Sequence, residues 1–135
     1  MVVWLDAAYG FSGSGVVSGG AGHWQLTQTK PQQDIVLIAS PILKTKTYRQ
    51  GQGVIRVNYV NLSDTKADSI LANCQAVYGY FEQLFGDIDG ANLTFFINLT
   101  RRQTSYARQG FISFQIKGQS IAEINRGIGH EIGHF

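Results

Sequence analysis

The feature that most constrains the fold is a change in hydrophobic period near residue 63. From there, apolar side chains recur at intervals of three and four residues for about six turns, as on one face of an α-helix. Ser63 or Asp64 can cap the N-terminus of such a helix, and Gly86 is typical of a C-terminus. We therefore expect one long helix over residues 64–86, with the single cysteine, Cys74, on its buried face.

Short β-type segments precede this helix. They lie within residues 2–10, 23–29, 34–40, 43–50 and 53–61, and turn residues separate the later ones. The last of them alternates, so that Ile55, Val57 and Tyr59 share one face of the expected strand. The segment 34–40 is apolar on both faces, which predicts a central strand.

Glycine is dense between Gly10 and Gly22, where the sequence reads GFSGSGVVSGGAG. Because glycine disfavours both helix and strand, we expect a flexible loop or a hairpin with a loose tip here. The three-glycine spacing of a dinucleotide-binding loop is not met, and no helical pattern follows, so a phosphate-binding loop is excluded.

A second α and β group follows residue 86. Strands are expected at 93–100 and 111–117, joined by a polar connection over residues 101–110. Ser120 and Glu123 then form a capping-box pattern that begins a final helix. Strands, helix, strands and helix in this order predict an α+β fold with no internal repeat.

Composition excludes several classes of function. Hydrophobic residues make up 44% of the 135 residues, charged residues make up 15%, and the net charge is +2. Basic side chains are scattered, so we expect no nucleic-acid binding. No apolar stretch approaches the ~20 residues that a membrane span needs. The compartment cannot be inferred from one cysteine.

The final helix ends in a motif of metal hydrolases, His130-Glu131-Ile132-Gly133-His134. On a helix, two histidines four residues apart leave the same face and can bind one zinc ion. A glutamate between them, about 100° round the helix, can reach a water on that zinc and take its proton. Three glycines, Gly127, Gly129 and Gly133, each cost roughly 1 kcal/mol in a helix, so they indicate close packing or space for a metal.

The order of these elements resembles the M1 type of gluzincin zinc metallopeptidase along nearly the whole chain. The specific matches are the helix end, YFEQLFGDID, and the motif itself, whereas the strand matches are loose. The resemblance implies that residues 1–49 are the tail of a β-rich N-terminal domain. It further implies that residues 50–135 are the first lobe of a thermolysin-like peptidase domain, with a mixed sheet, a long helix and a zinc-motif helix.

The resemblance implies zinc-dependent hydrolysis of a peptide or protein substrate. His130 and His134 are then the Zn²⁺ ligands, and Glu131 is the general base. The third ligand and the transition-state tyrosine of the family would lie beyond Phe135. We therefore expect a fragment that binds zinc weakly or not at all at equimolar metal and is inactive by itself.

One family feature is replaced in this chain. M1 aminopeptidases carry Gly-x-Met-Glu-Asn on an edge strand, and its glutamate holds the free amine of the substrate. Here Arg108, Gln109 and Gly110 occupy that region as candidate substrate-binding residues, and no acidic residue lies between Asp89 and Glu123. Aminopeptidase specificity is therefore not implied.

Two other functions stay open. A metzincin-type protease also carries the motif, but it has a third histidine six residues further on. A non-catalytic M1-like module that binds peptides or proteins would keep the fold without the chemistry. A peptidase lobe that lacks its other half should leave the apolar face of the last helix uncovered, so we expect self-association through Ile124, Ile128 and Phe135.

Overall fold

The computed structural model describes residues 1–28, 35–50, 53–86, 92–98, 106–108, 111–114 and 120–133. Within these residues the chain forms short strands, then a helix, further strands and a second helix. In order they are β1 (Val2–Trp4), β2 (Gly10–Gly13), β3 (Val16–Gly20), β4 (His23–Thr27), β5 (Leu37–Ser40), β6 (Lys44–Gln50), β7 (Gly53–Val60), α1 (Asp64–Phe85), β8 (Asn92–Asn98), β9 (Tyr106–Arg108), β10 (Phe111–Phe114) and α2 (Ile121–Ile132).

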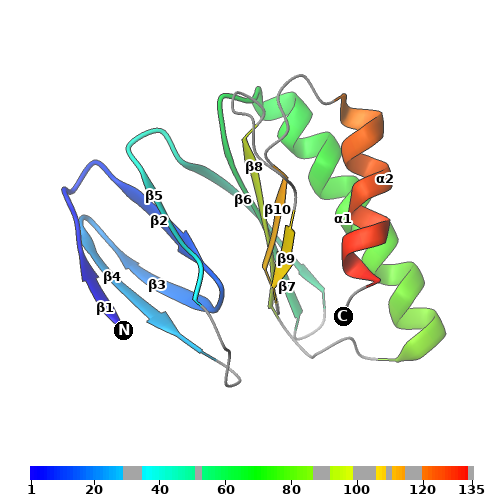
Figure 1. Ribbon diagram of the computed structural model, residues 1–135, viewed down its shortest axis with the longest axis horizontal. Helices are drawn as coiled ribbons and strands as arrows, with labels where there is room; N and C mark the ends of the chain where they lie inside the picture. Colours follow the sequence, from blue (N-terminus) through cyan, green and yellow to red (C-terminus); the bar gives the residue numbers. More distant parts are fainter. Residues whose placement is uncertain are drawn as a thin grey trace.

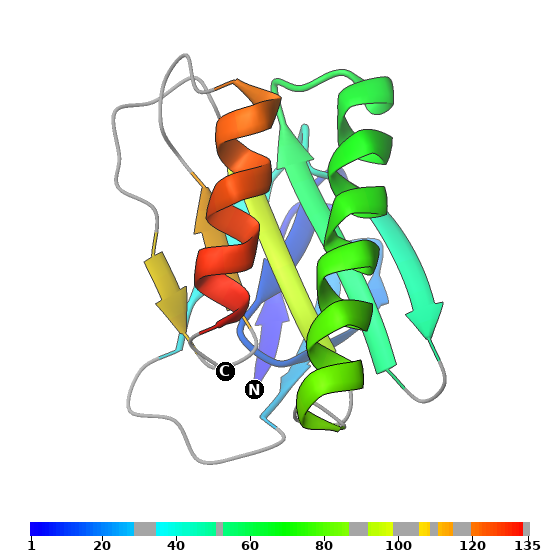
Figure 2. The same cartoon turned by 90° about the vertical axis from the view of Figure 1, so that its right-hand side faces the viewer.

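These elements form three layers (Figure 1). A five-stranded sheet with the order β6-β7-β8-β10-β9 stands in the middle. The sheets β1-β4-β3 and β2-β5 lie on one side of it, and α1 and α2 lie side by side on the other (Figure 2). Strands β7, β8 and β10 are parallel, whereas β6 and β9 pair antiparallel at the two edges. The expected α+β fold with a mixed sheet is confirmed.

Strand β7 lies between two apolar cores, and the residues that were predicted to share one of its faces belong to the first. Ile55, Val57 and Tyr59 are buried beneath the helices, together with residues from β8 and β10. On its opposite face, Val60 belongs to a second cluster, which also contains Phe96, Phe111, Val36, Ile38 and Leu43. The second cluster joins the central sheet to the chain segment around β5.

Helix α1 has the predicted bounds and caps. The Ser63 hydroxyl accepts a 3.3 Å hydrogen bond from the Lys66 amide, and Gly86 ends the helix at φ 79°. Cys74 is fully buried on the inner face, as expected, and this burial raises the pKa of its thiol. Neither α1 nor α2, the two helices of the described residues, is long and apolar enough to cross a membrane.

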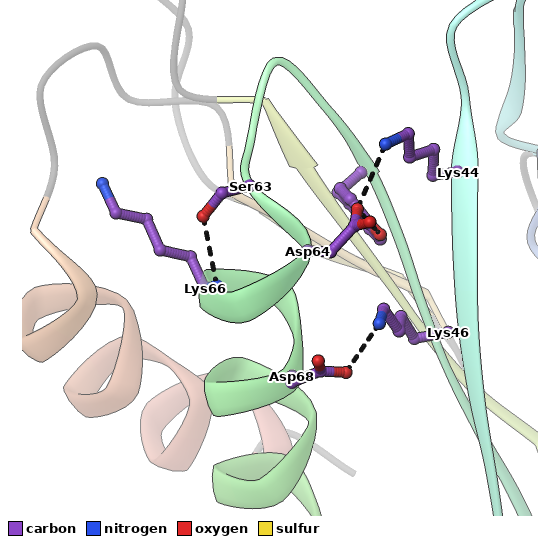
Figure 3. A network of polar contacts seen from close by, with 7 residues as sticks. Lys44, Lys46, Ser63, Asp64, Lys66 and Asp68 are labelled. Carbon is purple, nitrogen blue, oxygen red and sulfur yellow. Dashed lines mark hydrogen bonds and ion pairs between the residues drawn. The ribbon is translucent and has the colours of Figure 1, made fainter.

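Polar contacts tie the first turns of α1 to the sheet (Figure 3). Lys44 and Lys46 of β6 form ion pairs of 3.1 Å with Asp64 and 2.8 Å with Asp68. The Tyr59 hydroxyl of β7 also donates a 2.7 Å hydrogen bond to Asp64, and this bond is the first cause of the lowered pKa of that carboxyl. Because exposed ion pairs stabilise little, the buried tyrosine is the stronger part of this link.

Of the flexible loop and the hairpin expected over residues 10–22, the loop is wrong, because residues 10–13 and 16–20 form β2 and β3, whereas β3 does form a hairpin with β4 through Ala21 and Gly22. A Cβ atom on Gly13 would lie 2.7 Å from the carbonyl oxygen of Val36, and one on Gly10 would lie 2.9 Å from the Cβ of Leu43. Glycine at these positions lets β2 approach the chain around β5 closely. The glycines therefore serve strand packing here.

The expectation of a central strand at residues 34–40 is also wrong. Strand β5 pairs with β2 in a two-stranded sheet, and Leu37 is 46% exposed. Val36 and Ile38 pack against the second cluster, so only one of the two apolar faces is covered. A segment that is apolar on both faces is typical of a central strand, but the described neighbours of β5 bury only one of its faces.

The expected domain boundary at residues 49/50 falls inside a β-hairpin. Strand β6 pairs with β7 from Lys44 opposite Tyr59 to Gln50 opposite Gly53. The central sheet thus contains a strand from each side of the boundary. The division into two domains stays a prediction.

Candidate metal-binding helix

The predicted capping box begins α2. The Glu123 amide donates a 3.2 Å hydrogen bond to the Ser120 hydroxyl, and the Ser120 amide donates a 2.7 Å hydrogen bond to the Glu123 carboxylate. The second of these bonds is the first cause of the lowered pKa of Glu123. The two side chains thus satisfy amides at the start of the helix, and the Glu123 amide also donates a 3.1 Å hydrogen bond to the Ser120 carbonyl oxygen.

One face of α2 is buried within the chain. Ile124 and Ile128 are 0% exposed and Ile132 is 1% exposed, in the same core as Ile70, Cys74 and the inner face of the sheet. The expectation that Ile124 and Ile128 leave an uncovered face is therefore wrong, because α1 and the sheet cover them. Phe135, the third residue of that expectation, lies outside the described residues.

The motif lies at the C-terminal end of α2. His130 is exposed, and the backbone of Glu131 is helical, although the structure does not describe its side chain. The Gly133 amide donates a 3.2 Å hydrogen bond to the Gly129 carbonyl oxygen, so helical bonding reaches the residue before His134. His134 lies outside the described residues.

The three glycines of α2 have different surroundings. A Cβ atom on Gly127 would lie 2.7 Å from Cε1 of Phe114, whereas one on Gly129 would meet nothing within 4 Å. One on Gly133 would lie 3.3 Å from the His130 carbonyl oxygen and 3.9 Å from Cζ of Phe81. Close packing, which the glycines indicated in the sequence, is thus found at Gly127, and its partner is a strand.

The candidate substrate-binding residues begin on the edge strand β9. Arg108 is its last residue and pairs with Phe111 of β10. Gln109 and Gly110 lie outside the described residues. The sequence pattern had placed residues 106–108 in a polar connection, and the structure forms a strand there.

The described residues contain one side chain of the predicted zinc site, that of His130. Among them, no three His, Cys, Asp or Glu residues come together in a way that could hold a metal ion. His23, the other described histidine, stacks on Trp4 with ring centroids 4.2 Å apart in the β1-β4-β3 sheet. No local pattern in the sequence reveals the contact that Phe114 makes with Gly127 of α2.

Comparison with known proteins supports the resemblance at the level of the fold. No family profile matches the chain, and no curated protein matches its sequence. Among solved structures, the chain is similar to a mutant of the M1 zinc metallopeptidase from Deinococcus radiodurans, with a TM-score of 0.51 and 17% sequence identity. The match covers 93% of this chain and 32% of that structure, so the chain spans about a third of the metallopeptidase.

Proposed function

We propose that this chain contributes the zinc-motif helix of an M1-like metallopeptidase, which hydrolyses peptide bonds. One observation carries the proposal: the His-Glu-x-x-His motif ends a helix that is packed in a fold similar to part of an M1 zinc metallopeptidase. A sequence motif and an independently matched fold thus indicate the same chemistry. The first-lobe assignment of residues 50–135 belongs to this proposal.

The motif supplies two of the three protein ligands that a catalytic zinc site takes, and His130 and His134 are the proposed pair. His130 lies in α2, and the hydrogen bond from the Gly133 amide to Gly129 supports helical spacing in the motif. A zinc ion held by the two histidines would provide Lewis-acid chemistry toward the scissile carbonyl. The Glu131 carboxylate would accept the proton of the attacking water.

A peptide or protein substrate suits the edge of the central sheet. Strand β9 ends the sheet order of the described strands, and an extended peptide can add to such an edge through backbone hydrogen bonds. Arg108, Gln109 and Gly110 are the proposed substrate contacts at this edge. Since no acidic residue lies between Asp89 and Glu123, recognition of a free substrate amine by a glutamate here is not part of the proposal.

The lack of an acidic residue between Asp89 and Glu123 favours a second candidate function. A chain without the amine-binding glutamate can belong to a non-catalytic M1-like module that binds peptides or proteins along β9. The two functions differ in their need for metal. The catalytic function requires zinc at His130 and His134, and the binding module does not.

Zinc binding by the 135-residue chain tests the choice between them. We expect weak binding, incomplete at equimolar metal, that is lost in His130→Gln and in His134→Gln. His23→Gln is the matched control, because His23 lies on β4 and stacks on Trp4. Competition with a chromophoric chelator measures the affinity. Zinc binding that survives both motif substitutions contradicts the proposal, and no binding at millimolar zinc favours the non-catalytic module.

A further inference from the structure

The close approach of Gly127 to Phe114 lies one helical turn before the motif. Gly127 precedes His130 by three residues and Glu131 by four, which places it on the same side of α2. Phe114 is the last residue of β10 and is 1% exposed. The contact therefore joins the motif helix directly to the strand beside the edge strand β9.

The distance leaves no room for a side chain at residue 127. A Cβ atom there would lie 2.7 Å from Cε1, 3.4 Å from Cζ and 3.6 Å from Cδ1 of the Phe114 ring. Ordinary carbon contacts begin at 3.4 Å, so the helix or the ring must shift by about 0.7 Å to accept an alanine. The ring lies in the same core as Ile124 and Ile128, which restricts its movement.

Gly127 does not stabilise helix α2. In a helix interior, glycine is less favourable than alanine, and Gly129 shows that a side chain two residues later would meet open space. The glycine at residue 127 thus has a specific reason in the packing of the Phe114 ring.

We propose that Gly127 and Phe114 are a positioning pair, which sets the separation between the motif helix and strand β10. The inference rests on the proposed function, since His130 and Glu131 must face a peptide held at the sheet edge. The pair acts through the position of α2 and touches neither metal nor substrate.

Paramagnetic relaxation in the full 135-residue chain tests the proposal. Cu²⁺ bound at the motif histidines relaxes nearby amide protons, and the effect falls steeply with distance. We expect Gly127→Ala to weaken the relaxation of the β10 amides, because α2 moves away from the strand. Gly129→Ala is the matched control on the same helix and should leave the relaxation unchanged.

A substitution of Phe114 should reverse the effect of Gly127→Ala. Phe114→Leu removes Cε1 and Cζ, so the double variant Gly127→Ala/Phe114→Leu should regain the wild-type relaxation pattern. The single variant Phe114→Leu keeps Gly127 and should bring α2 nearer the strand. If Gly127→Ala does not fold, the relaxation of the β10 amides in Phe114→Leu alone still tests the proposal. If Gly127→Ala lowers the melting temperature but leaves the relaxation unchanged, the contact is structural only and the inference is overturned.

Failure of the proposed function gives a different result. If Cu²⁺ leaves the relaxation of wild type and of His130→Gln the same, the motif does not bind metal, and the proposed function fails. The positions of His130 and Phe114 in crystal structures of Gly127→Ala and wild type then decide the inference. A displaced α2 with an unmoved ring supports it, and an unmoved α2 with a displaced ring overturns it.

Discussion

Asn58 of β7 donates a 2.9 Å hydrogen bond from Nδ2 to the hydroxyl oxygen of Ser12 on β2, 46 residues earlier in the chain. Both side chains are buried, and Oδ1 of the Asn58 side chain accepts a 2.7 Å hydrogen bond from the Thr45 hydroxyl. This polar link lies on the face of the central sheet that turns away from the helices. It joins the N-terminal strands to that sheet beside an otherwise apolar cluster.

Replacing Asn58 should therefore destabilise the whole chain. We expect Asn58→Ala to lower the free energy of unfolding by about 1–3 kcal/mol, because it removes the Asn58 partner of the buried Ser12 hydroxyl. Urea denaturation followed by circular dichroism measures the change. Gln25→Ala, at an exposed position on β4, is the control. If Ser12→Ala and Asn58→Ala are fully additive in the double variant, the two side chains are not coupled.

The buried tyrosine at the start of α1 predicts a loss of stability at alkaline pH. Burial, followed by the hydrogen bond to Asp64, raises the pKa of Tyr59 from 10.0 to about 12. The neutral phenol is thus favoured in the folded state, and its contribution is complete below pH 10 and is lost as the pH rises through 12. The unfolding free energy of wild type should fall more than that of Tyr59→Phe over this range. Parallel pH profiles of the two proteins contradict the prediction.

The buried face of α2 predicts a large core effect. Ile128→Ala should lower the free energy of unfolding by about 2–5 kcal/mol, because it leaves a cavity against α1 and the sheet. Leu84→Ala on the exposed side of α1 should change it by less than about 0.5 kcal/mol. Leu84 is 56% exposed, whereas Ile128 is 0% exposed. Equal urea midpoints for the two variants would show that α2 does not dock as described.

The proposed general base predicts a loss of activity without a loss of metal. In a protein that combines this chain with a third zinc ligand, Glu131→Gln should lower peptide hydrolysis about 10²–10⁴-fold. Its zinc content should stay unchanged, because residue 131 is not a proposed ligand. Glu123→Gln on the same helix is the control, since glutamine also completes a capping box. Full activity in Glu131→Gln excludes this residue as the base.

Local patterns predicted those parts of the fold whose partners are close in sequence. Helix α1 begins after its predicted cap at Ser63 and ends before Gly86, and α2 begins after Ser120. The alternation of Ile55, Val57 and Tyr59 also predicted the buried face of β7. Each of these signals depends on residues within a few positions of one another.

The errors have a common cause in contacts between distant segments. Gly10 and Gly13 looked like loop residues because the chain they press against, at Leu43 and Val36, lies more than 20 residues away. The motif histidines are predicted as ligands from their spacing alone, and this stays a prediction. The Phe114–Gly127 contact could not be, because it requires knowing that α2 crosses β10.

The two-sided burial of β7 has a consequence for how the sheet can be assembled. Its odd-numbered residues, Ile55, Val57 and Tyr59, meet the helices, and Asn58 and Val60 meet the other layer. A slip of one residue along β6 or β8 would exchange the two faces, placing an amide under the helices and a phenol in the opposite layer. A misaligned pairing is thus unfavourable on both faces of β7, so the two layers together favour the native register.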